Sequence, residues 1–182
     1  EGSGQQKWEI PGNSNVSKEE SMALDSALQG LVDKAAIRDL MARYARGMDR
    51  PDFDLIAFSF TPDAYASYDG GGIRWEAQGR GNIVDKLRPS ISRTDSSTHF
   101  MGDQEIQING DTADVETYAI IYILYTVEGA QYQSMRGIHY EDKMVRHDGG
   151  WQVQHRVVHS DWRRGIRVDT SVPGIDQVPV PE

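Results

Sequence analysis

The sequence predicts an α+β fold in which N-terminal helices pack on one face of a curved, mostly antiparallel sheet. In the first third of the 182 residues, apolar side chains recur at helical spacing, whereas later segments are rich in Tyr, Ile, Val and Thr and have the pattern of strands. Short Asn-Gly, Glu-Gly and Asp-Gly turn signals separate those later segments, as in a meander of antiparallel strands. The length suits one domain with a sizeable core.

Polar residues open the chain, and helical signals follow them. Residues 1–16 are expected to form a flexible arm, because they are polar and contain a Pro-Gly pair. Ser17 and Glu20 have the spacing of a capping box, so a first helix is expected to begin there. It should run to Gln29, because the following Gly30 breaks or kinks it.

A stronger helix is expected over residues 31–49, where apolar residues fall near helical spacing between charged ones. It should end there because Pro51 biases the preceding residue away from helix. Asp52 can cap a short third helix that ends at Phe58. Another short helix is expected over residues 81–87.

Strand patterns dominate the rest of the chain. The segment 112–127 is apolar on both alternating faces, so it is expected to be covered by helices on one face and by a second subunit on the other. Covering of that second face by the chain's own tail is the alternative. Residues 164–182 are rich in proline and are expected to form an extended tail. The expected strands are residues 64–68, 73–77, 96–108, 112–127, 133–146 and 151–162.

Composition argues against several classes of function. With 28 acidic and 19 basic side chains, the net charge is −9, which disfavours broad binding to nucleic acid or to an anionic membrane. The absence of cysteine removes a disulfide framework, a thiolate nucleophile, a zinc knuckle and an iron–sulfur site. The longest apolar run is too short to span a bilayer, and the first residues lack a signal-peptide pattern, so a cytoplasmic location is expected.

Neither a metal site nor a cofactor is expected. His155 and His159 lie on one expected strand, where four residues span roughly 13 Å, too far for two side chains to share an ion. No phosphate loop, dinucleotide-binding fingerprint or nucleophile elbow occurs in the sequence. What remains is acid/base chemistry with Asp, His, Tyr and Arg side chains.

Asp49 and His99 are the first candidates for this chemistry. Asp49 is the last residue of an expected helix, where the negative end of the helix dipole disfavours a carboxylate. Its presence there therefore suggests a functional role. A solvated residue at the helix end is the alternative. His99 lies at the entry to an expected strand, and imidazole titrates near neutrality, which suits proton transfer.

Several ordered segments also carry a family resemblance. They are residues 36–49, 52–54, 60–64, 79–80, 98–99, 108–113, 140–142 and 150–153. Together they resemble the SnoaL-like family of the nuclear transport factor 2-like superfamily, over residues 31–163. The resemblance implies a conical barrel, with the helices packed in a strongly curved sheet and one domain at residues 17–163. It is similar to the branch that holds scytalone dehydratase, hexachlorocyclohexane dehydrochlorinase and bile-acid 7α-dehydratase.

Enzymes of that branch use an Asp–His pair, and Asp49 and His99 match its two positions. The resemblance implies that His99 is a general base and that Asp49 orients it. It also implies that Arg156, five residues after Trp151, stabilises a developing anion. Tyr44, five residues before Asp49, would donate a proton to a leaving oxygen. A structural ion pair for Arg156 and a core position for Tyr44 are the alternatives.

The implied activity is that of a cofactor-independent lyase. It would remove water or another small group from a hydrophobic cyclic or aromatic molecule, or cleave a carbon–carbon bond by a retro-aldol route. Isomerisation through an enol is compatible with the same residues. The alternatives are a polyketide cyclase or ketosteroid isomerase-like enzyme, and a non-catalytic small-molecule-binding module.

The resemblance has consequences for the substrate and for assembly. The bile-acid enzyme's second Asp falls at or near Ile121, which argues against bile-acid chemistry. A homo-oligomer is implied, a trimer rather than a dimer. The side chains expected to line the substrate pocket are Tyr68, Trp75, Tyr118, Tyr122 and His159.

Overall fold

The computed structural model describes residues 17–70 and 73–168. The expected arm at residues 1–16 and the end of the expected tail therefore lie outside the described residues. Helices and strands follow one another in the order that the sequence predicts. The elements are α1 (Lys18–Asp49), α2 (Phe53–Phe58), β1 (Phe60–Gly70), β2 (Ile73–Gln78), α3 (Arg80–Ile91), β3 (Ser96–Asn109), β4 (Thr112–Val127), β5 (Ala130–His147) and β6 (Gly150–Arg167).

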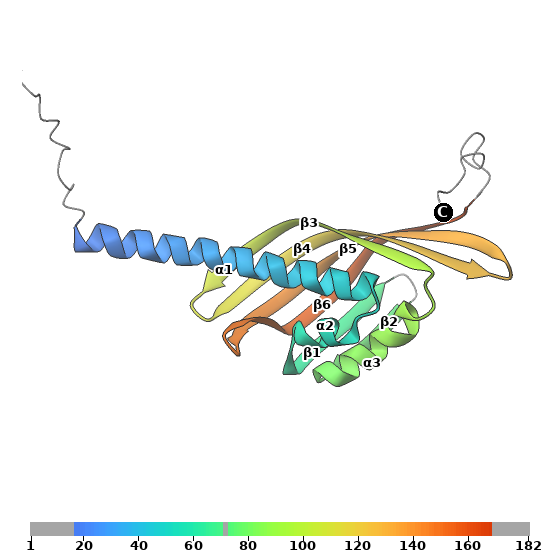
Figure 1. Cartoon of the computed structure of the whole chain (residues 1–182), viewed down its shortest axis with the longest axis horizontal. Helices are drawn as coiled ribbons and strands as arrows, with labels where there is room; N and C mark the ends of the chain where they lie inside the picture. Colours follow the sequence, from blue (N-terminus) through green and yellow to red (C-terminus); the bar gives the residue numbers. More distant parts are fainter. Residues whose placement is uncertain (1–16, 71–72, 169–182) are drawn as a thin grey trace, which may run out of the picture.

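The strands form one six-stranded sheet in the order β2-β1-β6-β5-β4-β3. Neighbouring strands are antiparallel, except that β1 and β6 pair in parallel. The sheet is curved and the helices lie on one of its faces (Figure 1). The predicted α+β class, with helices against a mostly antiparallel sheet, is confirmed. The sheet stays open at β2 and β3 rather than closing into a complete barrel.

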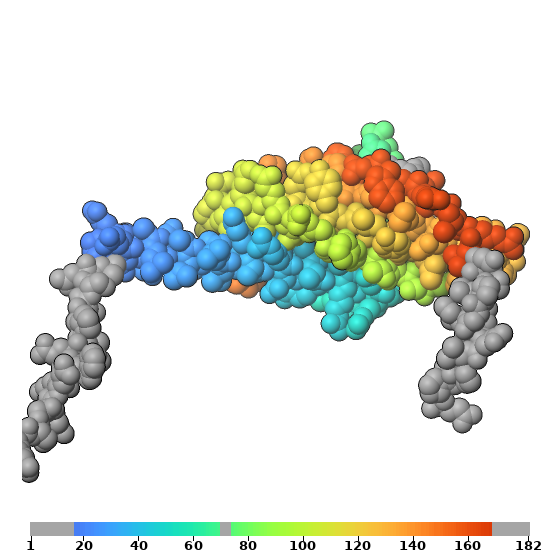
Figure 2. Space-filling model, turned by 90° about the horizontal axis from the view of Figure 1, so that it is seen from above, coloured from blue at the N-terminus to red at the C-terminus, as the bar shows by residue number. Residues whose placement is uncertain are grey.

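The first helix, α1, is continuous over 32 residues. The predicted capping box of Ser17 and Glu20 is present, with its two hydrogen bonds at 2.8 and 3.2 Å. The predicted break at Gly30 is wrong, because one glycine costs only about 1 kcal/mol of helix propensity and a long helix is cooperative. The N-terminal half of α1 projects beyond the sheet (Figures 1 and 2).

A buried carboxylate holds the middle of α1 against the sheet. Asp33 is 4% exposed and accepts hydrogen bonds from Arg146 Nη2 at 2.5 Å and from Trp151 Nε1 at 3.3 Å. Burial opposes ionisation of Asp33, but the hydrogen bonds from Arg146 and Trp151 outweigh it and lower the pKa of this carboxyl. This network sets the position of α1 over β5 and β6.

The end of α1 is fixed by its contact with α2. Asp52 caps α2 as predicted, because its Oδ1 accepts the backbone N–H of Leu55 at 2.9 Å. Gly47 lets α2 approach closely, since a Cβ there would lie 2.9 Å from Ile56 Cγ1. The close approach places Asp49 at the point where α1 meets the sheet.

Several elements extend beyond their expected bounds. The helix α3 continues through Pro89 to Ile91, because a proline in the last turn removes only one hydrogen bond near the helix end. The strand β1 already begins at Phe60, and β6 runs to Arg167 in pairing with β5. Residues 164–167 are therefore strand rather than tail. Among the described residues, no helix is long and apolar enough to cross a membrane.

The core lies between the helices and the inner face of the sheet. Along β4, the odd-numbered residues from Ala113 to Ile121 are buried. The even-numbered Tyr118 and Tyr122 are 55% and 37% exposed. Within the described chain the helices therefore cover only one face of β4. Covering of the other face by a second subunit stays a prediction.

Candidate active site

A cavity of about 640 Å³ lies between the end of α1, helix α3 and the inner face of the sheet. Met48, Leu87, Ile121 and Ile123 contribute apolar walls. The polar side chains that line it include a histidine, four tyrosines, three cations and several serine and threonine hydroxyls. A concavity that combines apolar walls with polar groups is typical of a small-molecule site.

Asp49 and His99 meet at the wall of this cavity. Asp49 is the last residue of α1, and His99 lies near the start of β3. Asp49 Oδ1 lies 2.6 Å from His99 Nδ1 and accepts the Ser97 hydroxyl at 2.9 Å. The two carboxylate oxygens also accept the backbone N–H of His99, at 3.1 and 3.0 Å. The donors of β3 thus offset the unfavourable helix dipole at Asp49.

This hydrogen bonding fixes the chemical states of the pair. Partial burial favours the neutral acid, but the hydrogen bonds from His99 and Ser97 outweigh it and lower the pKa of Asp49. Because a carboxylate can only accept, His99 Nδ1 carries the proton that is shared with Asp49. In the neutral imidazole, Nε2 then keeps its lone pair. The His99 side chain is 5% exposed and lines the cavity, so a bound ligand can reach Nε2.

A cluster of tyrosines forms another part of the cavity wall. The hydroxyls of Tyr44 and Tyr68 lie 2.8 Å apart, and Tyr68 stacks on Trp75 with ring centroids 4.3 Å apart. Tyr140 meets the Tyr44 ring edge-on at 6.1 Å. Burial raises the pKa of Tyr68 and of Tyr140 well above the usual range, so both are neutral hydrogen-bond donors. Tyr68 and Trp75, which the sequence predicts at the substrate pocket, line the cavity, and so does Tyr44, which the sequence predicts as a proton donor.

Arg156 lies behind the tyrosines and is fully buried, rather than at the cavity surface. Its Nε and Nη2 donate to the two carboxylate oxygens of Asp142, each at 2.7 Å. The guanidinium carbon also lies 4.4 Å from the ring centroid of Tyr44 and 4.6 Å from that of Tyr140. The expected direct contact of Arg156 with a developing anion is therefore corrected: the side chain forms the structural ion pair that the sequence left as the alternative.

Three other expected pocket residues lie elsewhere. Tyr118 and Tyr122 point to the outer face of β4, and His159 lies on the outer face of β6 beside His139. None of the three lines the cavity. Both faces of β4 are apolar, so the sequence pattern does not identify the inner one, and the helices cover the face that carries Ile121 instead.

Sequence reasoning missed two cavity residues on β5. Tyr140 lies in a segment that carries the family resemblance, and it lines the cavity together with Ile138. Arg136 lines the cavity, and its Nε donates to Ser134 Oγ at 3.5 Å. Within the described chain no carboxylate pairs with Arg136. The signal that could have found both residues is the period of two along β5, once its inner face is known.

The cavity wall is positively charged near Arg136. Lys86 and Arg93 also line it, whereas no Asp or Glu among the described residues does. His99, Ile121 and Arg136 are register partners across three neighbouring strands. Two strand spacings, roughly 10 Å, therefore separate the backbones of His99 and Arg136 on the same face. The cavity thus offers a base and a cation at different ends of one apolar surface.

The described residues also contain one group of possible metal ligands, on the opposite face of the sheet. It consists of His139, Glu141 and His159, whose ligand atoms lie within 4.8 Å of one another. The sequence predicts no such group, because the spacing argument considers one strand at a time. Here the pairing of β5 with β6 brings the two histidines together.

Comparison with known proteins agrees with this fold. Residues 29–157 match the SnoaL-like domain family. An uncharacterised protein of Mycobacterium tuberculosis is 29% identical over 127 residues, which cover 69% of this chain and 83% of the relative. Its homologue in Mycobacterium bovis matches to the same extent.

Solved structures show the same architecture. A candidate scytalone dehydratase of Novosphingobium aromaticivorans aligns with a TM-score of 0.67 at 22% identity, over 82% of this chain and 97% of that one. A hexachlorocyclohexane dehydrochlorinase of Novosphingobium barchaimii also has a TM-score of 0.67, at 17% identity, over 81% of this chain and 99% of that one. At these identities the likeness shows the fold, which is of the nuclear transport factor 2-like type.

Proposed function

Since this chain belongs to the SnoaL-like domain family, we propose that it is a cofactor-independent lyase. It removes water or another small leaving group from a hydrophobic cyclic or aromatic molecule. The observation that carries the proposal is the 2.6 Å contact of Asp49 Oδ1 with His99 Nδ1, at the wall of a largely apolar cavity. The dehydratase and dehydrochlorinase among the structural neighbours support the reaction type.

His99 is the general base of the proposed reaction. Its Nε2 accepts a proton from a substrate carbon, and the electrons of that C–H bond form the new double bond while the leaving group departs. Asp49 holds the Nδ1 proton and stabilises the imidazolium that forms. For a leaving hydroxyl, the imidazolium returns the proton to oxygen, and water is released.

The tyrosines act as hydrogen-bond donors to the substrate oxygen on which negative charge develops during the reaction. Tyr68 and Tyr140 are poor proton sources, because burial raises the pKa of both hydroxyls well above the usual range. Their neutral hydroxyls can still stabilise negative charge inside a site that excludes bulk water. Tyr44 holds the Tyr68 hydroxyl in place through the 2.8 Å contact. This division of roles assigns proton transfer to His99 rather than to Tyr44.

Arg136 identifies a further property of the substrate. A partly buried guanidinium without a carboxylate partner among the described residues is costly unless a ligand completes its hydrogen bonds. Lys86 and Arg93 add positive charge to the same cavity. We infer that the substrate carries an anionic group, such as a carboxylate, at the end of the molecule away from the carbon that His99 deprotonates.

A polyketide cyclase or ketosteroid isomerase-like mechanism needs a carboxylate base deep in the cavity. Among the described residues that line the cavity, none is Asp or Glu, and Asp49 lies behind His99 with its oxygens engaged. This distribution favours the lyase. A non-catalytic binding module is the other hypothesis, and a measurement of turnover distinguishes it from the lyase.

The test is turnover of a panel of cyclic β-hydroxy ketones and aromatic acids with a β-leaving group, followed by the absorbance of the new conjugated double bond. Deuterium exchange at the acidic carbon, followed by NMR in D₂O, detects proton abstraction even where elimination is slow. We expect His99→Ala and Asp49→Asn to lower both rates about 10²- to 10⁴-fold.

His155→Ala is the matched control, because His155 stacks on Tyr65 outside the cavity and should keep full activity. Near-full rates in both the His99→Ala and Asp49→Asn variants would overturn the mechanism. Binding of panel compounds by the wild type without turnover or exchange would favour the binding module.

A further inference from the structure

The outer face of the sheet carries a histidine pair that the proposed reaction does not use. His139 on β5 and His159 on β6 are register partners, and their rings stack with centroids 4.5 Å apart at 15°. Glu141 follows His139 by two residues, so it projects from the same face of β5. We propose that these three side chains bind a divalent transition-metal ion, with Zn²⁺ as the preferred ion.

The ligand atoms of the three side chains lie close together. His159 Nε2 lies 3.5 Å from Glu141 Oε1, and His139 Nε2 lies 4.0 Å from the same oxygen. In a tetrahedral zinc site with metal–ligand distances of about 2.0–2.1 Å, ligand atoms lie about 3.3 Å apart. The atoms of the group, within 4.8 Å of one another, need only side-chain rotations to close around an ion. The partial exposure of all three side chains permits those rotations.

A neighbouring carboxylate prepares His139 for this role. Asp161 Oδ2 lies 3.0 Å from His139 Nδ1, so Nδ1 carries a proton and the Nε2 lone pair is free. A carboxylate behind a metal-bound histidine is the usual way in which proteins orient such a ligand. His159 Nε2 is buried and forms no hydrogen bond with another described residue. A buried nitrogen without a hydrogen bond is costly, and a metal ion would satisfy it.

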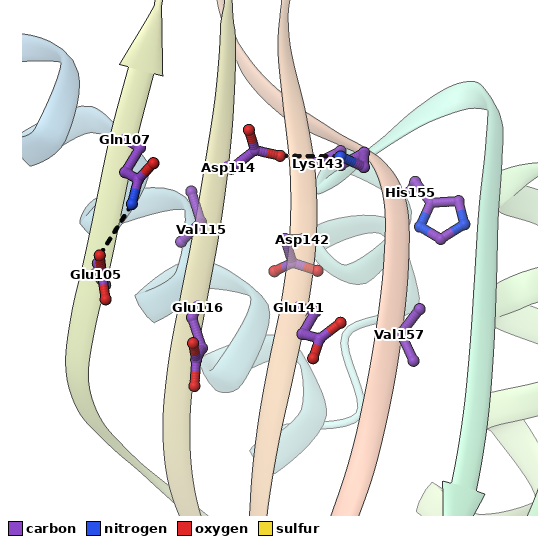
Figure 3. A pocket seen from close by; sticks show the side chains of 10 residues that line it. All are labelled: Glu105, Gln107, Asp114, Val115, Glu116, Glu141, Asp142, Lys143, His155 and Val157. Carbon is purple, nitrogen blue, oxygen red and sulfur yellow. Dashed lines mark hydrogen bonds and ion pairs between the residues drawn. The ribbon is translucent and has the colours of Figure 1, made fainter.

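The surrounding charges favour a cation at this place. Glu105, Glu116 and Glu141 are direct register partners across β3, β4 and β5, and all three line the shallow hollow of Figure 3. Like charges that face each other across a sheet are destabilising. Together with Asp161, this row of carboxylates concentrates cations at the histidine pair. A bound ion would offset part of the repulsion and join β5 to β6.

The donor set selects the class of ion. Two imidazoles and one carboxylate suit Zn²⁺ and its neighbours in the transition series, and three protein ligands leave a position for water. Mg²⁺ and Ca²⁺ prefer sites built from oxygen ligands alone. The proposed site lies on the face of the sheet opposite the cavity, so it is independent of the proposed lyase activity.

The experiment is a calorimetric titration of the full, tag-free chain with ZnCl₂, and with MgCl₂ as the contrasting ion. We expect one Zn²⁺ per chain and no Mg²⁺ binding. His139→Ala, His159→Ala and Glu141→Gln should each raise the dissociation constant at least tenfold. The absorption spectrum of the Co²⁺-loaded chain provides a second measurement, which should report nitrogen ligation in the wild type and lose it in the two histidine variants.

Two variants serve as controls and should bind Zn²⁺ like the wild type. His155→Ala removes an imidazole from the same face of the sheet, and His99→Ala removes the histidine of the cavity. Loss of Zn²⁺ binding in His99→Ala but not in His139→Ala would place the ion in the cavity and overturn the proposal. So would an absence of Zn²⁺ binding in the wild type, or equal binding of Mg²⁺.

Discussion

Replacing Arg156 by methionine tests whether this side chain serves stability or the reaction. Arg156 and Asp142 are both fully buried, and the guanidinium donates twice to the carboxylate at 2.7 Å. Burial opposes the charge on Arg156, but Asp142 outweighs it and holds the pKa of the guanidinium well above its usual value. Burial raises the pKa of Asp142, but its two oxygens accept separate hydrogen bonds from the guanidinium, which is the geometry of a carboxylate. Arg156→Met leaves this buried group without its counter-ion.

The magnitude follows from that uncompensated charge. Removing one member of a buried ion pair costs about 3–5 kcal/mol, which is a large part of the about 5–15 kcal/mol that stabilises a typical domain. Arg156→Met should therefore bring the chain close to unfolding. Adding Asp142→Leu removes the orphaned charge, and the double variant should regain most of the lost free energy, because an apolar pair of similar volume is often as stable.

The assay is urea denaturation followed by circular dichroism, for the wild type, both single variants and the double variant. Arg74→Met is the matched control, because Arg74 pairs with Asp69 on an exposed surface and should change the unfolding free energy little. If Arg156→Met folds with near wild-type stability and only turnover is lost, the guanidinium contacts the substrate and the structural assignment is wrong. A double variant no more stable than Arg156→Met would refute the charge argument.

Three further predictions concern the cavity and assembly. The pKa of Asp49 is lower in the folded chain than in the unfolded one. The contribution of this carboxylate to the free energy of unfolding is therefore complete above the unfolded pKa of about 3.9, and it is lost as the pH falls through the lower folded pKa. Urea denaturation should therefore show the stability gap between the wild type and Asp49→Asn shrinking below about pH 4, and a constant gap would contradict this reading. Arg136→Gln should weaken binding of the anionic probe 2-naphthoate about tenfold or more, because a charge-assisted hydrogen bond is lost. The same variant should bind the neutral 2-naphthamide like the wild type, and the outer-face variant Lys143→Gln should bind 2-naphthoate like the wild type. We propose that the chain forms a homo-oligomer, a trimer rather than a dimer, and that the exposed apolar residues of α1 contribute to the interface. The wild type should sediment as the oligomer, and the double variant Leu28→Ser, Leu31→Ser should sediment with a lower mass. A wild type that sediments as a monomer at micromolar concentration would refute the assembly.

The Asp49–His99 contact was predictable because both residues stand next to strong local signals. Pro51 ends α1, and Asp52 begins the next helix, so the position of Asp49 at a helix end follows from the sequence. His99 lies at the start of a strand with clear alternation. The contact between the two residues was predicted from the family resemblance, because no local sequence pattern relates two positions that are 50 residues apart.

The misplaced residues share one physical cause. A period of two shows that Tyr118 and Ile121 face opposite sides of β4, but it does not show which side the helices cover when both sides are apolar. The sequence likewise does not show that His159 faces outward and Arg136 lines the cavity. The predicted helix break at Gly30 is wrong for another reason. The propensity cost of a glycine is local, whereas the continuity of α1 depends on the whole helix and on the hydrogen bond between Arg146 and Asp33.

The two hydrogen-bonded acid–base pairs beside the cavity differ in exposure, and that difference sets what each can do. Asp49 is 22% exposed and contacts a histidine that lines the cavity, so protons can enter and leave the pair. Arg156 is fully buried with Asp142, which holds the pKa of the guanidinium well above its usual value, so Arg156 stays protonated. That charge lies behind Tyr68 and Tyr140, where it opposes the burial that raises the pKa of both hydroxyls. Arg156 does not line the cavity, so we expect it to influence the proposed reaction through the tyrosines, as a positioning residue.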